Sequence, residues 1–296
     1  MESLKHLIQL NLVLRECHLK NLSILLRLSR KNLNGILKEI IASKILEVEM
    51  HKKKRSMHSY ENDCSMFSIK SFYQSLQNAK NKKHPGVIAE VKKKSPSKGI
   101  LRDNFVPSEI AIAYQIAGAS CISVLTDKNF FGGCIEDMIS VKKNCTIPIL
   151  RKDFIIDPYQ ILQSRASGAD CILLIVAALT PSLMIELEDQ ALSLGMDVLI
   201  EVHDESEVEL ALSCKSRLIG VNNRDLNTFK VDIDTSIRLN SYIPKNRLII
   251  SESGISSSEN IRHLMKHNIN SFLIGESLIS AKSPGEALKT LISDFV

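Results

Sequence analysis

Downstream of residue 86, short apolar runs of β type alternate with longer helical stretches, and this pattern occurs eight times. Such alternation is typical of βαβ units, whose strands pair in parallel. The helical stretches begin at proline or small polar residues, as at Pro107, and end at glycine, as at Gly118. These residues are ordinary start and stop signals of helices. The sequence therefore predicts strands at 87–91, 121–125, 148–150, 171–176, 197–201, 218–221, 247–250 and 271–274.

Eight successive units favour a closed (β/α)8 TIM barrel, an α/β fold that needs about 250 residues. The glycine-rich motif G-x-G-x-x-G of doubly wound dinucleotide-binding sheets is absent from the sequence. A helical pattern begins at Gly35, with Ile36, Ile40 and Ile41 at helical spacing. We therefore expect a barrel domain over 34–296 that carries an N-terminal helical extension.

Residues 1–33 form that N-terminal extension, and the sequence leaves its structure open. The segment is rich in leucine and contains more basic than acidic residues. This composition is compatible with an amphipathic helix or an organellar leader. We expect a cytoplasmic protein, with a plastid location as the alternative if the segment is a leader.

The basic runs at 52–55 and 80–83 flank a polar segment without strong periodicity. We interpret both runs as solvated linker charges, because isolated charge runs are more often solvated than used for binding.

Composition narrows the class of partner. The 296 residues include 38 Lys and Arg against 33 Asp and Glu, a net charge of +5. This excess is too small to indicate nucleic acid, and it suits a small anionic substrate. No apolar stretch has the length of a membrane span. The seven cysteines form no C-x-x-C pair, and Cys121 and Cys171 lie in apolar runs, so we expect buried thiols and no metal site.

Polar residues follow the predicted strands at the end where a TIM barrel assembles its active site. Lys152, Glu201 and Asn222 come at or just after the third, fifth and sixth runs. Glu90 and Lys92 end the first run, and period-two alternation places both on the interior face. Charges in a barrel mouth are costly unless they are paired or used. We interpret them together as a catalytic site rather than as a structural plug of salt bridges.

The last two strands are followed by glycines that suit a phosphate cradle. Ser253 and Gly254 follow the seventh strand, and Gly275 and Glu276 follow the eighth. Glycine permits close approach of the backbone to phosphate oxygens, and this pair of loops is a frequent phosphate site in TIM barrels.

Several segments together resemble one known family, the indole-3-glycerol phosphate synthases. The first of them, from Val87 to Ser97, reads VIAEVKKKSPS, which is similar to the first-strand signature of that family. Further similar segments follow in the expected order, and the resemblance runs from about Gly35 to the C-terminus. They lie at 130–133, 150–154, 173–176, 199–203, 220–226, 251–255 and 272–275.

The resemblance implies a carboxy-lyase of tryptophan biosynthesis that works without a cofactor. Its substrate is anthranilate joined to a deoxyribulose phosphate, which is cyclised with loss of carbon dioxide and water. By this resemblance Lys152 is the general acid and Glu201 is the general base of the dehydration. Lys92 neutralises an anion, while Glu90 and Asn222 hold hydroxyl groups and the polar network.

The resemblance also implies the binding residues. Ser95 and Arg224 contact the substrate carboxylate, and the phosphate rests on the cradle after the last two strands. The apolar walls around the aryl ring are Phe131, Phe154 and Leu173. Glu276 departs from the small serine of many relatives, and its carboxylate would repel phosphate unless the side chain turns away and only its N–H is used.

Three histidines are close enough to other polar groups to be considered as functional. His203 follows Glu201 by two positions, and we expect it to be packed or solvent-facing rather than catalytic. His263 and His267 are four positions apart, and without a third ligand in the sequence we expect exposed helix histidines.

Two alternatives compete with this interpretation. Phosphoribosylanthranilate isomerase shares the phosphate cradle but relies on a cysteine in its first strand, and the run 87–91 has none. A barrel retained as a partner-binding scaffold would be favoured by loss of Lys152 or Glu201, and both are present. The resemblance leaves open an association with other enzymes of tryptophan biosynthesis.

Removal of residues 1–31 should leave the ring-closing activity largely intact, because every candidate catalytic residue lies downstream of residue 89. The measurement is the turnover of the truncated chain beside that of the full chain. Loss of turnover in a folded truncation would contradict the prediction.

Overall fold

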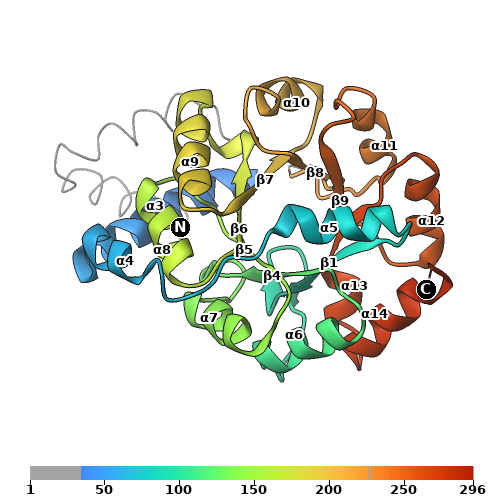
Figure 1. Cartoon of the computed structure of the whole chain (residues 1–296), viewed down its shortest axis with the longest axis horizontal. Coiled ribbons are helices and arrows are strands. Elements are labelled where there is room, and N and C mark those ends of the chain that lie inside the picture. Colours follow the sequence, from blue (N-terminus) through green and yellow to red (C-terminus); the bar gives the residue numbers. More distant parts are fainter. Residues whose placement is uncertain (1–34, 227, 296) are drawn as a thin grey trace, which may run out of the picture.

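A closed barrel of eight parallel strands forms the centre of the molecule (Figure 1). The computed structural model describes residues 35–226 and 228–295. The strands adjoin in the order β1-β10-β9-β8-β7-β6-β5-β4, which confirms the predicted TIM barrel. They are β1 (Gly86–Val91), β4 (Cys121–Leu125), β5 (Ile149–Lys152), β6 (Cys171–Ile175), β7 (Asp197–Val202), β8 (Leu218–Asn222), β9 (Leu248–Glu252) and β10 (Ser271–Ile274).

Each predicted run is a strand, with small differences at the ends. The third and seventh strands extend beyond the predicted residues 150 and 250, so that Lys152 and Glu252 belong to β5 and β9 themselves. A short antiparallel pair, β2 (Lys94–Ser95) and β3 (Gly99–Ile100), lies in the loop after β1.

Helices surround the barrel and start and stop at the predicted signals. The side chains of Thr180, Asp204 and Ser257 each accept a backbone N–H of the first turn. Gly118 and Gly168 follow helix ends with φ of 99° and 91°, the left-handed region that glycine favours. The helices of this ring are α6 (Pro107–Ile116), α7 (Ile135–Asn144), α8 (Pro158–Ala166), η1 (Val176–Ala178), α9 (Pro181–Ser193), α10 (Glu205–Ala211), α11 (Asp234–Asn240), α12 (Ser258–Lys266), α13 (Glu276–Ile279), α14 (Pro284–Ile292) and η2 (Ser293–Phe295).

Among the described residues from 35 onward, three helices precede the barrel: α3 (Gly35–Lys54), α4 (Met57–Asp63) and α5 (Phe72–Asn81). In Figure 1, α5 runs across the barrel near β1. It covers the amino ends of the strands, where the Tyr73 N–H donates to the Asp197 carboxylate at the start of β7 over 3.0 Å. Its Leu76 is completely buried beside Gly86, the first residue of β1. The amino end of the barrel is thus closed by α5, which leaves the carboxyl end for a site.

The interpretation of 52–55 as linker charges is wrong, although Lys53 and Lys54 are exposed to solvent as predicted. Residues 52–54 end α3, and Lys52 Nζ lies 2.6 Å from Asp157 Oδ2, the N-cap of α8. Arg55 pairs with Asp63 of α4. The sequence between the two basic runs forms helices because Ser56 and Ser71 cap α4 and α5. Residues 81–83 of the second run are exposed, as predicted.

Two of the cysteines confirm the prediction of buried thiols. Cys121 and Cys171 are completely buried, and burial raises the pKa of both thiols well above the usual range. Over the described part of the chain, no helix is both long enough and apolar enough to cross a membrane. The predicted extension 1–33 and its boundary with the barrel domain lie outside the described residues.

Candidate active site

A cavity of about 880 Å³ opens at the carboxyl ends of the strands. All of the site residues predicted from the sequence, whether from the strand-end pattern or from the family resemblance, line this one cavity. They are Glu90, Lys92, Ser95, Phe131, Lys152, Phe154, Leu173, Glu201, Asn222, Arg224, Ser253, Gly254, Gly275 and Glu276.

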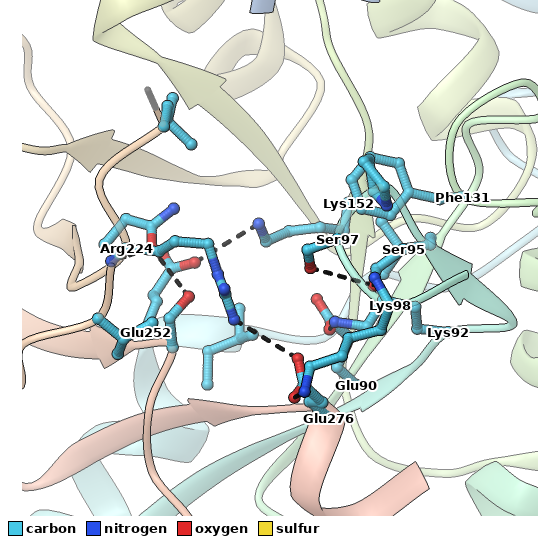
Figure 2. Close-up of a pocket in the computed structure, with 18 of the residues that line it drawn as sticks. Glu90, Lys92, Ser95, Ser97, Lys98, Phe131, Lys152, Arg224, Glu252 and Glu276 are labelled. Atoms are coloured by element: carbon cyan, nitrogen blue, oxygen red, sulfur yellow. Dashed lines mark hydrogen bonds and ion pairs between the residues drawn. The ribbon is translucent and has the colours of Figure 1, made fainter. Parts of the chain in front are cut away.

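A buried ion-pair cluster lies at the centre of the cavity. Lys152 Nζ is 3.2 Å from Glu201 Oε2 and 3.5 Å from Glu252 Oε2, so one ammonium connects β5, β7 and β9. Asn222 Nδ2 donates to the other oxygen of Glu201 over 3.2 Å. The strand register produces this arrangement, because Asn222 pairs with Glu252 at the ends of β8 and β9. Figure 2 labels Lys152 and Glu252 among the residues that line the site.

The cluster separates the protonation states of its members. Burial alone would lower the pKa of Lys152, but the carboxylates of Glu201, Glu252 and Glu90 outweigh burial and raise it above the usual range. Burial would raise the pKa of Glu201, yet the ammonium of Lys152 and its hydrogen-bond donors hold that pKa well below the usual range. Lys152 is therefore a protonated acid beside an ionised carboxylate.

Glu252 is in the opposite state. Burial, reinforced by the nearby carboxylates of Glu201 and Glu90, raises its pKa to about 8, and Lys152 only partly offsets this. Glu252 therefore carries a proton at neutral pH. Glu252 follows the seventh predicted run as Lys152 follows the third, but it was given no role among the site residues predicted from the sequence. The available signal was its place two residues beyond Ile250, on the same face of an extended strand.

Two glycines make room for carboxylates of the site. A Cβ at Gly275 would collide with the Glu90 carboxylate, and a Cβ at Gly220 would collide with that of Glu252. Glu90 in turn forms an ion pair with Lys92, with 2.6 Å between Glu90 Oε2 and Lys92 Nζ. These glycines are needed for the close packing of buried acids against the backbone of neighbouring strands.

One end of the cavity is apolar. The rings of Phe131 and Phe154 lie 6.1 Å apart between centroids and are tilted by 34°. Leu173 of β6 and the α3 residues Leu37 and Ile40 line the same cavity. An aryl group would be held here among apolar side chains.

The loops after β9 and β1 supply polar groups. Ser253 and Gly254 both have left-handed backbone conformations, with φ of 67° and 82°, and Ser253 Oγ donates to Asn222 Oδ1 over 2.9 Å. From the loop after β1, Ser95 is nearly buried and its Oγ accepts the Lys98 N–H over 3.3 Å.

Phosphate binding was expected to require that the Glu276 side chain turn away from the cavity. The side chain does not turn away. Its Oε2 lies 3.5 Å from Arg224 Nη2, and its Oε1 lies 3.8 Å from Lys98 Nζ. Figure 2 shows both cations directed at Glu276. The carboxylate points inward because two basic side chains from other loops attract it.

His203 is packed, as expected, but it also touches the cluster. Its Nε2 is 3.4 Å from Glu201 Oε1, and its Nδ1 is 3.0 Å from Glu207 Oε2. Burial lowers the pKa of His203, but the two carboxylates outweigh burial and raise it to about 10. His263 lies on the surface of α12, 2.8 Å from Asp234. Within residues 35–226 and 228–295, no three or more His, Cys, Asp or Glu side chains are grouped to hold a metal ion.

Comparison with known proteins assigns the family. A sequence model described as indole-3-glycerol phosphate synthase matches residues 37–291. The chain is 44% identical to the indole-3-glycerol phosphate synthase of Bordetella pertussis, over 88% of this chain and 100% of that protein. It is 46% identical to the protein of the same name from Burkholderia vietnamiensis, over 86% of this chain and 98% of the relative.

The chain belongs to the indole-3-glycerol phosphate synthase family. This confirms the resemblance and sets aside the isomerase family as the assignment. Solved structures with low sequence identity share the fold alone. The tryptophan synthase α subunit of Legionella pneumophila is 12% identical with a TM-score of 0.55, covering 75% of this chain and 95% of its own.

In this member of the indole-3-glycerol phosphate synthase family, Glu252→Gln should make the free energy of unfolding less dependent on pH. The raised pKa of Glu252 means that the unfolded chain loses this proton first as the pH rises. The wild-type protein should therefore lose stability, on the order of a few kcal/mol, between pH 4.5 and about 8. Glutamine has no such proton to lose.

The measurement is urea unfolding of both proteins at several pH values across this window. Parallel pH dependences of the two proteins would show that Glu252 does not hold a proton in the folded state.

Proposed function

We propose that this chain converts 1-(2-carboxyphenylamino)-1-deoxyribulose 5-phosphate into indole-3-glycerol phosphate, with release of carbon dioxide and water. Membership of the family supports this reaction. The observation that carries the mechanism is the Lys152 ammonium, held between Glu201 and Glu252 in the cavity that Phe131 and Phe154 also line. A protonated acid there lies within reach of a ketone whose neighbouring aryl ring occupies the apolar end.

The first step forms the carbon–carbon bond of the new ring. The aryl carbon that bears the carboxylate attacks the ketone carbon, C2 of the ribulose chain, and Lys152 donates a proton to the ketone oxygen. The carboxylate then leaves as carbon dioxide, and the electrons of the broken bond restore the aromatic ring. Lys92 neutralises the negative charge of the substrate, while Glu90 holds the Lys92 ammonium at 2.6 Å.

The first step converts the ketone into a hydroxyl group, and the second step removes that hydroxyl group. Glu201 accepts a proton from C1 of the former sugar chain, and the hydroxyl leaves as water with a proton from Lys152. Lys152 gave up its proton in the first step and must regain one before the hydroxyl leaves. Glu252 lies 3.5 Å from Lys152 and carries a proton at neutral pH, so it is placed to return that proton to the amine. Asn222 orients Glu201 through its amide donor.

The remaining residues bind the substrate. Phe131, Phe154 and Leu173 enclose the aryl ring and exclude water, which strengthens the charges around it. Ser95 and Arg224 contact the carboxylate before it leaves. The phosphate binds to the loops after the last two strands, at Ser253, Gly254 and Gly275, next to Glu276.

The catalytic domain corresponds to 34–296, and the family match over 37–291 supports this assignment. Cytoplasmic localisation and association with other enzymes of tryptophan biosynthesis stay predictions from the sequence.

Lys152→Met should lower kcat by about 10² or more, the usual scale of a positioned general acid, with a smaller effect on KM. Methionine is also unbranched and is shorter by one atom, and it has no proton to give. The measurement is steady-state turnover of the substrate by the variant. Lys128→Met, at an exposed position outside the cavity, is the matched control and should behave as the wild type. Normal turnover by Lys152→Met would refute the assigned acid.

Glu276→Ser should keep or lower the KM for the substrate. The change removes a carboxylate beside the phosphate loops and frees Arg224 and Lys98 to attract an anion. Glu209→Ser, at an exposed position on α10, removes the same charge far from the loops and serves as the control. A clear rise in KM for Glu276→Ser alone would show that this carboxylate helps to bind the substrate.

A further inference from the structure

A lysine of the helix before the barrel is completely buried behind the apolar end of the cavity. Lys44 of α3 has no exposed surface, and its Nζ lies 3.0 Å from Asp127 Oδ2 and 2.8 Å from Asp153 Oδ1. Its own helix adds Glu47 at 3.0 Å. A buried ammonium is stable only with such partners, and these carboxylates raise its pKa although burial lowers it.

Asp127 holds the loop that carries one wall of the aryl pocket. It follows β4, and its Oδ1 accepts the backbone N–H groups of Phe130 and Phe131 over 2.8 and 3.2 Å. Its second oxygen faces Lys44. The position of the Phe131 ring therefore depends on a carboxylate that is fixed from behind by α3.

Asp153 does the same for Phe154, the second aromatic residue of the pocket. Its Oδ1 contacts Lys44 and also accepts the N–H of Phe154 over 2.8 Å. Its Oδ2 accepts hydrogen bonds from Thr126 over 2.6 Å and from Arg151 over 3.0 Å. If Lys44 were removed, Asp153 would still accept hydrogen bonds from Thr126 and Arg151. In the described part of the chain, Lys44 is the only cation within ion-pair distance of Asp127.

We propose that Lys44 is a positioning residue that sets the spacing of the aryl pocket, through Asp127 and Asp153, and thereby determines affinity for the aryl part of the substrate. One ammonium fixes both carboxylates that hold Phe131 and Phe154, whose rings lie 6.1 Å apart. The inference rests on the proposed function for the identity of the ligand.

Two further contacts support this role of α3. Ser43 Oγ accepts a hydrogen bond from Asn129 of the Phe131 loop over 2.8 Å. Leu37 and Ile40 of the same helix line the cavity directly. Lys152 pairs with Glu201 and Glu252, and Lys44 pairs with a separate set of carboxylates. The role therefore predicts an effect on binding rather than on the proton-transfer step.

The test uses Lys44→Met in the full chain, with Lys38→Met, an exposed lysine of the same helix, as the matched control. We expect KM to rise about tenfold in Lys44→Met, with kcat changed much less, and both constants to stay unchanged in Lys38→Met. Lys44→Arg, which keeps the cation, should recover part of the affinity. A fall in kcat with unchanged KM, or wild-type constants in folded Lys44→Met, would overturn the proposal.

Binding of anthranilate, followed by its own fluorescence, separates this proposal from the proposed function because it needs no turnover. Anthranilate affinity should fall about tenfold in Lys44→Met, while the affinity for inorganic phosphate stays at the wild-type value. Equal anthranilate affinity in the two proteins would overturn the role of Lys44. Absence of turnover in the wild type would instead count against the proposed function.

Lys44→Met leaves a buried carboxylate without its cation and is expected to lose stability. If it does not fold, Lys44→Met combined with Asp127→Asn removes the unpaired charge and is used instead. The combined variant should bind anthranilate at least as weakly as Asp127→Asn alone, because it breaks the Lys44–Asp127 contact and also removes the Lys44–Asp153 contact. Wild-type affinity in the folded combined variant would contradict the proposal.

Discussion

The ammonium of Lys152 among the buried carboxylates of Glu201 and Glu252 is the interaction on which the rest of the site depends. A charge at this depth is stable only when opposite charges surround it. The barrel provides them because parallel strands in register end at one edge, so that residues distant in sequence come within ion-pair distance. Gly220 and Gly275 then leave space for the acids on the neighbouring strands.

Two glutamates of this cluster have opposite protonation states, and their surroundings explain why. Lys152, Asn222 and His203 contact Glu201 and stabilise its negative charge. Glu252 has Lys152 at the longer distance of 3.5 Å and has other carboxylates nearby, which disfavour a charge. Environments that push the pKa values of neighbouring acids apart are what acid and base chemistry at one pH requires. The same cavity combines this cluster with aromatic walls held from behind by α3.

The fold and most of the site follow from local patterns in the sequence. Lys152 and Glu201 were predictable because a strand pattern followed by a polar residue identifies the catalytic end of a barrel. Lys44 was not, since a lysine in a helical pattern usually faces solvent, and its partners Asp127 and Asp153 come from distant loops. The inward direction of Glu276 likewise depends on Arg224 and Lys98, which only the folded chain brings together.

The central claim is that these strand-end side chains close an indole ring on a single bound substrate. The most direct measurement mixes the purified full chain with 1-(2-carboxyphenylamino)-1-deoxyribulose 5-phosphate and follows indole fluorescence together with released carbon dioxide. The account predicts that both rise together, with one carbon dioxide for each indole formed. Absence of indole from a folded protein, or indole formed without equal carbon dioxide, would contradict it.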